Sequence, residues 1–282
     1  MSQVAVGSGL GGTQRPSVRG PALVVLDWQT RRILVTVKTY PNPSRKYTET
    51  VCVAGIDLEA KRWIRLYPVP FRDLNSWQRF SKYSVIEARV SRTSKDTRPE
   101  SFRVDRNSIR VVEQAWDTKR KWARRREIVL PLRAASLCAL KDEQAKSATS
   151  LGLVKPENVR FYAEPVDTTS AEFRAAFYDQ LDAFAGAKQA IEPIPYRFGY
   201  RFRCAGEERC RGHDLSVIDW ELMQLYRTLR DRENCEQDVL RKVRQKWEGE
   251  MLRSDKDTWF YVGNVFLHPR SFLVLGVFWP PK

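Results

Sequence analysis

The side chains best suited to chemistry are concentrated in one short stretch of the chain, residues 204–221. Cys204, Cys210 and His213 lie within ten residues of one another. Thiolate sulfur and imidazole nitrogen are ligands that Zn²⁺ prefers in proteins. The spacing Cys-x5-Cys-x2-His therefore predicts a small structural zinc knuckle, with Gly206 and Gly212 allowing a tight loop. The alternative interpretation is a loop with two free cysteines and a histidine at the surface.

A tetrahedral zinc site needs a fourth ligand, and the stretch itself supplies none. Cys235 is the first candidate for this position and His268 is the second. Cys138 lies among apolar residues, so the sequence predicts a core residue there. The odd number of cysteines, the lack of a secretory signal and the lack of a membrane-spanning apolar run favour a reducing, cytoplasmic setting.

Two carboxylates, Asp219 and Glu221, follow the cysteines at the start of a helix predicted over residues 216–230. One hypothesis brings both carboxylates together with His213 in a cleft, for metal-assisted hydrolysis or general acid–base catalysis. The alternative is that Asp219 stabilises the helix N-terminus, together with Ser216 three residues earlier. Glu221 is harder to explain by capping, so it is the first choice for a catalytic carboxylate.

The composition favours a polyanionic partner. The 282 residues carry 49 Lys and Arg against 34 Asp and Glu, a net charge of +15, which points to DNA or RNA. Six of the eight residues from Lys119 to Arg126 are basic, and on a helix they would form a broad basic face. Residues 196–203 alternate aromatic side chains with Arg or Gly, as in a strand with an arginine-lined outer face. The candidate nucleic-acid contacts are Arg45, Lys46, Tyr47, Arg65, Lys119, Arg120, Lys121, Trp122, Arg124, Arg125, Arg126, Arg197, Arg201 and Arg203.

The pattern of short strands and turn residues predicts an α+β fold that begins with a small, curved β-barrel. The barrel strands are expected at 31–40, 49–55, 63–67, 83–90 and 101–104. The expected regions are a flexible tail over 1–20, an OB-like barrel over 21–112, a basic helical connecting region over 113–190, and a C-terminal α/β domain over 191–282. In the last region, helices 216–230 and 236–252 are expected to cover a small sheet.

Two parts of the chain resemble known groups of proteins. Lys38, Cys52–Gly55 and Trp63–Arg65, followed by Pro68, resemble the dual-OB domain of bacterial proteins found near genome-conflict and defence systems, over residues 30–110. This resemblance implies a barrel that stacks the bases of single strands on aromatic side chains in a basic groove. The candidate groove residues are Tyr40, Tyr47, Trp63, Tyr67, Arg65 and Arg72, and for each aromatic the alternative is core packing.

The C-terminal resemblance covers residues 195–282. Gly212-His213, Asp219-Trp-Glu221, Phe260–Gly263 and Gly276–Pro281 are similar to a widespread set of uncharacterised bacterial proteins, which implies no known activity. The leading prediction is therefore a nucleic-acid-binding protein, an accessory of a bacterial defence or mobile-element system. The first alternative is a metal-dependent nuclease or base-acting enzyme that uses His213, Asp219 and Glu221. A third hypothesis is a subunit that docks a partner protein, with the charge incidental, and exposed apolar surface on helix 236–252 would favour it. None of the three involves a membrane.

Overall fold

The computed structural model describes residues 27–40, 42–44, 48–93, 95–168 and 194–282. The tail over 1–20, the predicted contacts at Arg45, Lys46 and Tyr47, and a helix expected over 171–185 lie outside the described residues. Within the described ranges, no helix combines the length and the apolar character needed to cross a bilayer.

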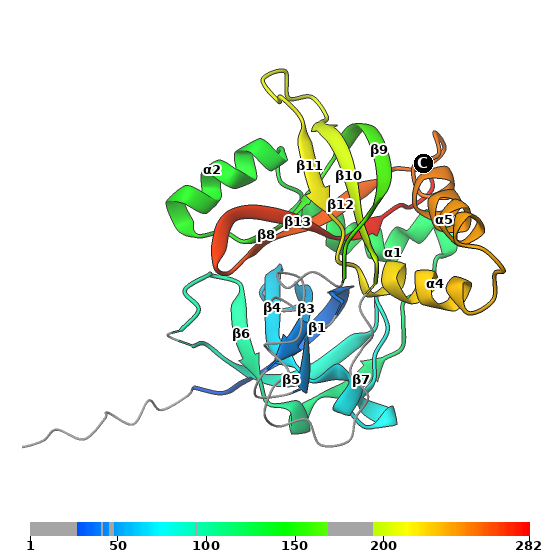
Figure 1. The fold of residues 1–282 in the computed structure, drawn as a ribbon. Helices are drawn as coiled ribbons and strands as arrows, with labels where there is room; N and C mark the ends of the chain where they lie inside the picture. The colour runs from blue at the N-terminus through cyan, green and yellow to red at the C-terminus, as the bar shows by residue number, and fades with distance from the viewer. Residues whose placement is uncertain (1–26, 41, 45–47, 94, 169–193) are drawn as a thin grey trace, which may run out of the picture.

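Among the described residues, five strands of the first half form a closed β-barrel, drawn in blue to teal in Figure 1. The strands are β1 (Gln29–Lys38), β3 (Thr48–Asp57), β4 (Arg62–Val69), β5 (Val85–Ser91) and β6 (Ser101–Val104). They pair in the order β1-β3-β4-β6-β5, and the β1–β5 pair closes the ring. The β4–β6 pair is parallel. β2 (Asn42–Ser44) pairs with β3, and β7 (Arg110–Glu113) pairs with β5.

Strand β1 shows why the barrel sequence reads as a nearly continuous apolar run. Successive side chains of a strand point to opposite faces. Ile33 and Val35 pack inside the barrel with Ile64. Leu34 and Val37 point the other way and join a second core, which the barrel shares with the C-terminal half. Short 3₁₀ turns close the barrel ends: η1 (Phe71–Asp73), η2 (Ser76–Gln78) and η3 (Arg106–Ser108).

The second half contains two three-stranded sheets within the described residues. One has the order β13-β12-β8, from β8 (Leu151–Val154), β12 (Trp259–Val265) and β13 (His268–Phe278). The other has the order β11-β10-β9, from β9 (Pro156–Pro165), β10 (Tyr196–Cys204) and β11 (His213–Ser216). The helices are α1 (Lys119–Val129), α2 (Leu137–Ser147), α4 (Trp220–Arg230) and α5 (Glu236–Arg244), which continues as a π-helix over Gln245–Glu250; η4 (Leu130–Leu132) follows α1.

The β8–β12–β13 sheet lies between the barrel and the other sheet (Figure 1). Its alternating side chains join two different cores. Tyr261 and Leu275 pack with Leu34 of the barrel. Phe260 and Val274 pack on the opposite side, in the core of the C-terminal half. Because this sheet is buried on both faces, the barrel and the C-terminal half form one packed body.

The α+β class is confirmed, but the segment 113–190 is more than a helical connection. It contributes α1, α2 and also strands β8 and β9, which are edge strands of the two C-terminal sheets. The basic segment is not one regular helix, because Arg120, Lys121 and Trp122 have φ values of 47°, 55° and 63°. Left-handed backbone costs about 1–2 kcal/mol per non-glycine residue. This turn points Trp122 into the interior, against Phe278.

Candidate functional site

Four potential metal ligands converge in the C-terminal half: Cys138, Cys204, Cys210 and His213. Their ligand atoms all lie within 4.8 Å of one another. His213 Nε2 is 3.5 Å from Cys138 Sγ, 3.2 Å from Cys204 Sγ and 3.3 Å from Cys210 Sγ. In a tetrahedral zinc site with ordinary bond lengths, nitrogen and sulfur ligands are about 3.6 Å apart. The donor types and their spacing therefore fit a Cys₃His zinc site.

Three separate elements supply these ligands. Cys138 lies in the first turn of α2, Cys204 is the last residue of β10, and His213 is the first residue of β11. The loop between β10 and β11 bends through Gly206 and Gly212, whose φ values are +71° and +99°, a region that glycine adopts without strain. The predicted glycine-dependent loop is thus confirmed, and a bound ion would join α2 to the sheet.

The surroundings of the four ligands suit a cation. Leu137 N donates to Cys204 Sγ, and Cys204 N donates to Cys210 Sγ, both at 3.3 Å. Burial and the neighbouring thiols raise the pKa of Cys138 to about 12, so this thiol needs a nearby positive charge, such as a bound metal ion, in order to ionise. Burial, with a smaller effect of Lys141, lowers the pKa of His213 to about 4, which keeps the imidazole neutral, as metal ligation requires.

The fourth ligand differs from the predicted one. Cys235 is exposed at the N-terminus of α5, where its thiol donates to Asp238 Oδ2 at 3.2 Å. His268 is exposed at the start of β13. Cys138, predicted as a plain core residue, takes this position instead. The one local feature of the sequence that could have indicated Cys138 is its position at a helix N-terminus, where thiolates are stabilised. Its contact with Cys204, Cys210 and His213 joins distant parts of the chain and could not be predicted locally.

Asp219 and Glu221 form a second cluster, with Lys82 from the barrel. Lys82 Nζ is 2.6 Å from Asp219 Oδ2 and 3.1 Å from Glu221 Oε2. Asp219 caps α4, since its Oδ1 accepts a hydrogen bond from Glu221 N at 2.8 Å. The capping interpretation of Asp219 is confirmed, although Ser216 lies in β11 and takes no part in the cap.

Burial dominates the electrostatics of this second cluster. Burial raises the pKa of Asp219 to about 6, although Lys82 acts to lower it. Burial alone would lower the pKa of Lys82, but Asp219 and Glu221 together raise it. The nearby Lys38 has a lowered pKa, chiefly because it is buried, and it donates to Phe80 O at 3.1 Å. Lys82 is therefore the cation that offsets the buried Asp219 carboxylate.

The predicted convergence of His213 with the two carboxylates is not formed. His213 begins β11, and Asp219 follows the end of that strand. Six residues of nearly extended chain cover on the order of 20 Å. His213 contacts thiols, whereas Asp219 and Glu221 bind Lys82. Among the described residues, a cluster of potential metal ligands and a separate buried ion-pair cluster are thus present, and His213 does not join the two carboxylates.

A pocket of about 380 Å³ lies beside Glu221, between α4 and the helix that continues α5. Leu225, Trp247 and Met251 contribute to its lining. Trp247, however, is only 2% exposed. The apolar side of helix 236–252, whose exposure would have favoured the partner-docking hypothesis, packs mainly into the core of the C-terminal half.

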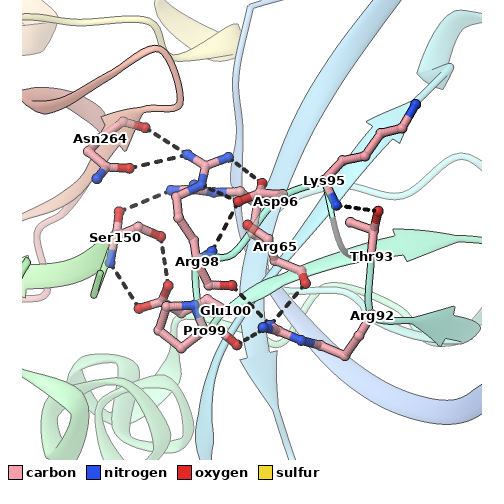
Figure 2. Close-up of polar contacts among 11 residues, drawn as sticks. Arg65, Arg92, Thr93, Lys95, Asp96, Arg98, Pro99, Glu100, Ser150 and Asn264 are labelled. Atoms are coloured by element: carbon pink, nitrogen blue, oxygen red, sulfur yellow. Dashed lines mark hydrogen bonds and ion pairs between the residues drawn. The ribbon is translucent and has the colours of Figure 1, made fainter. Parts of the chain in front are cut away.

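Most of the predicted basic contacts have structural roles. Arg65 is 2% exposed, and its Nη2 donates to Ser150 O at 3.0 Å (Figure 2). The prediction that Arg65 contacts nucleic acid at the surface is therefore wrong. Arg125 is also buried, and its guanidinium donates to Trp116 O. The remaining placements follow. Trp122 is packed inside, Arg124 pairs with Glu113 at 2.7 Å, Arg126 pairs with Asp257 at 3.5 Å, and Lys119, Arg120 and Lys121 are exposed.

The arginines of β10 lie on the exposed face of the strand, as the alternation predicts. Arg197 pairs with Glu164 at 2.6 Å. Arg201 pairs with Glu164 at 2.7 Å and with Asp214 at 2.9 Å. Glu164 on β9 and Asp214 on β11 neutralise the two arginines. The sequence of β10 alone could not show these pairs, because the acids lie on neighbouring strands. Arg203 is exposed and lies 3.4 Å from Glu208 O.

The predicted groove aromatics of the barrel have mixed positions. Trp63 packs into the shared core, and its Nε1 donates to Leu132 O at 3.3 Å. Tyr40 packs against Trp220 in the C-terminal half. Tyr67 is 46% exposed. Sequence reasoning missed Trp77, which is 59% exposed, because the residues around it were read only as a helical turn.

Two family models match the chain, each described only as a domain of unknown function. The first, DUF8758, matches residues 29–131. The second, DUF8757, matches residues 133–282. The boundary between them separates the barrel and α1 from the half that carries the Cys₃His cluster. No curated protein matches the chain.

Proposed function

Since the chain belongs to the family described as a domain of unknown function (DUF8757), a description that assigns no activity, we propose a function from the structure. The protein binds nucleic acid through its barrel half. A structural Zn²⁺, held by Cys138, Cys204, Cys210 and His213, joins α2 to the β9–β11 sheet in the other half. The zinc stabilises the fold and takes no part in catalysis, because four protein ligands leave no open position for substrate.

The distribution of charge along the chain carries the nucleic-acid proposal. Residues 29–131 contain 24 Lys and Arg against 11 Asp and Glu, a net charge of +13. Residues 133–282 contain 23 against 22, a net charge of +1. The excess positive charge of the protein therefore belongs almost entirely to one packed half. A net positive charge concentrated in one half of the protein favours the binding of a linear polyanion, such as the phosphate backbone of a nucleic acid.

One end of the barrel adds a stacking surface to this charge. The exposed Trp77 lies in η2, next to Gln78 and Arg79. Gln78 Nε2 donates to Arg106 O at 2.8 Å, which ties η2 to η3. Arg79 donates to Leu74 O at 3.2 Å. These bonds hold the turn that carries the exposed indole, and Arg79 and Arg106 are exposed on the two joined turns. The indole can stack on a base while such arginines contact phosphates.

Two further expectations are compatible with this proposal. A closed five-stranded barrel has the strand number of the OB fold, whose members bind oligonucleotides. A site with three thiolate ligands needs a reducing compartment, which favours the cytoplasm. The link to bacterial defence loci rests on the sequence resemblance and stays a prediction.

The test is binding of the zinc-loaded full chain to labelled DNA and RNA, followed by fluorescence anisotropy. We expect the affinity to fall at least about tenfold between roughly 50 and 200 mM salt, because bound phosphates release counterions. Arg106→Gln should reduce the slope of log Kd against log salt by about one unit. Trp77→Ala should weaken binding about fivefold or more through lost stacking.

Arg203→Gln is the matched control, because Arg203 is an exposed arginine on the nearly neutral half. It should leave both the affinity and the salt slope unchanged. The proposal is contradicted if the wild-type protein fails to bind at low salt, if its affinity is independent of salt, or if Arg203→Gln weakens binding as much as Arg106→Gln does.

A further inference from the structure

The turn between β12 and β13 exposes two large apolar side chains side by side. Phe266 is 50% exposed and Leu267 is 78% exposed. They are the exposed large apolar residues of the C-terminal half within the described part of the chain. Single exposed apolar residues are common, but an adjacent pair at the end of a hairpin forms a protruding apolar tip that suits insertion into a partner.

The barrel holds this tip in place through Arg98, which lies in the loop between β5 and β6. Arg98 Nη1 donates to both the backbone oxygen and the Oδ1 of Asn264, each at 3.2 Å (Figure 2). Asn264 Nδ2 in turn donates to Pro269 O at 2.9 Å, across the turn. Asp96 fixes the other side of the Arg98 guanidinium, at 2.6 and 2.9 Å. The tip is therefore braced before any partner binds.

A second set of bonds braces the same end of the sheet, where Asn264 N donates to Ser150 O at 3.0 Å. Glu100 Oε1 accepts from Ser150 N at 3.0 Å, and Glu100 Oε2 accepts from Ser150 Oγ at 2.6 Å. Ser150 immediately precedes β8, which pairs with β12. Figure 2 shows Arg65, Arg98 and Glu100 reaching from the barrel to these two points of the sheet. A braced tip loses little conformational entropy on binding, which favours affinity.

The segments next to the tip carry positive charge. The Arg98 guanidinium lies 5.2 Å from the centre of the Phe266 ring. Lys95, from the same barrel loop, and Arg270, on β13, are exposed and form no ion pair with another described residue. The nearby acid, Asp96, is already bound to Arg98. A partner that receives the apolar tip would therefore meet exposed cations on β13 and on the barrel loop that holds the tip.

We propose that Phe266 and Leu267 form a wedge that enters between two neighbouring base pairs of a nucleic-acid duplex, while Lys95 and Arg270 contact the flanking phosphates. This inference rests on the proposed function and adds that part of the bound nucleic acid is a duplex that can be kinked. Leucine lacks a π-face for stacking single-stranded bases, whereas apolar wedges of Phe and Leu are used to unstack and bend duplexes. Pyrimidine–purine steps are the preferred points of entry, because they unstack most easily.

The experiment uses the zinc-loaded full chain and a short DNA duplex with several TA steps, in which 2-aminopurine replaces adenine. Stacking quenches 2-aminopurine, so insertion of the wedge should raise its fluorescence severalfold. The double variant Phe266→Ala/Leu267→Ala should lose this rise and bind the duplex at least about tenfold more weakly, with an unchanged salt slope. Val112→Ala is the matched control, since Val112 is 44% exposed on β7, and it should behave like the wild type.

Two outcomes would overturn the wedge while leaving the proposed function intact: salt-dependent binding without a rise in fluorescence, and a tip variant that binds the duplex as tightly as the wild type. The second is also the result expected if the tip contacts a partner protein. Lys95→Gln/Arg270→Gln should reduce the salt slope by about two units. Failure of the wild-type chain to bind any nucleic acid would contradict the proposed function itself, and so the two failures are distinguishable.

Discussion

Replacing Cys138 by Ser is expected to abolish stoichiometric zinc binding and to lower the thermal unfolding temperature by roughly 10 °C or more. The wild-type protein should contain one zinc per chain. The physical reason is that Cys138 supplies one of four converging ligands from α2, whereas the others come from β10, β11 and their loop. Without it, the buried Cys204 and Cys210 thiolates lose the ion that compensates their charge. Structural zinc contributes on the order of 10 kcal/mol to the folding of small zinc domains.

The measurement is elemental analysis on protein purified without chelator, together with thermal unfolding of each variant. Cys210→Ser should behave like Cys138→Ser. Cys235→Ser is the control, because its thiol is exposed and contacts Asp238 instead of the cluster, and it should retain both the zinc and the stability. Zinc loss in Cys235→Ser with full retention in Cys138→Ser would show that the ligand set is wrong.

Replacing Lys82 by Met is expected to destabilise the protein by about 3–5 kcal/mol at pH 8, because it leaves a buried carboxylate without its cation. Asp219 is fully buried and lies 2.6 Å from Lys82. In the variant, Asp219 keeps its hydrogen bond from Glu221 N, which cannot replace a full positive charge. Urea unfolding of the wild type and the variant measures the difference in the free energy of unfolding.

The pH dependence of this loss has a definite sign. The folded-state pKa of Asp219 is about 6, above the unfolded value near 4, and it should rise further when Lys82 is removed. A group with a raised folded pKa favours folding below its unfolded pKa and loses that contribution as the pH rises through its folded pKa. The destabilisation by Lys82→Met should therefore be smaller at pH 5 than at pH 8.

The double variant Lys82→Met/Asp219→Asn serves as the control, since it carries no ionisable group at position 219. Its free energy of unfolding should show little of the additional pH dependence. An equal destabilisation by Lys82→Met at pH 5 and pH 8 would contradict the assignment of Lys82 as the cation that offsets a buried, ionised Asp219.

Local patterns predicted the elements whose stability depends on near neighbours. The barrel strands were recognisable because β-branched and apolar side chains recur between turn residues, as in β1 and β3. The Cys₃His cluster was partly recognisable because Cys204, Cys210 and His213 are close in sequence. The cap at Asp219 was recognisable because it precedes an amphipathic helix. Ser216 was also expected to stabilise the start of this helix, but it lies in strand β11 and takes no part in the cap.

Contacts between distant segments were not predictable from those patterns. Cys138 joins the Cys₃His cluster only because α2 packs against the end of β10. Arg65 looked like a surface contact because arginine is rarely buried, yet the C-terminal half covers that face of β4 and supplies Ser150 O as its acceptor. The basic run at 119–126 looked like one helical face, but the left-handed turn at Arg120–Trp122 divides it.

The most direct test of the central claim, that the basic barrel half holds nucleic acid, is ultraviolet crosslinking of the zinc-loaded full chain to DNA, with the crosslinked peptides identified by mass spectrometry. We expect the crosslinks to fall within residues 29–131 and at the Phe266–Leu267 turn, and to disappear as salt is raised. Crosslinks confined to other parts of residues 133–282, such as β10 or α5, would contradict the claim.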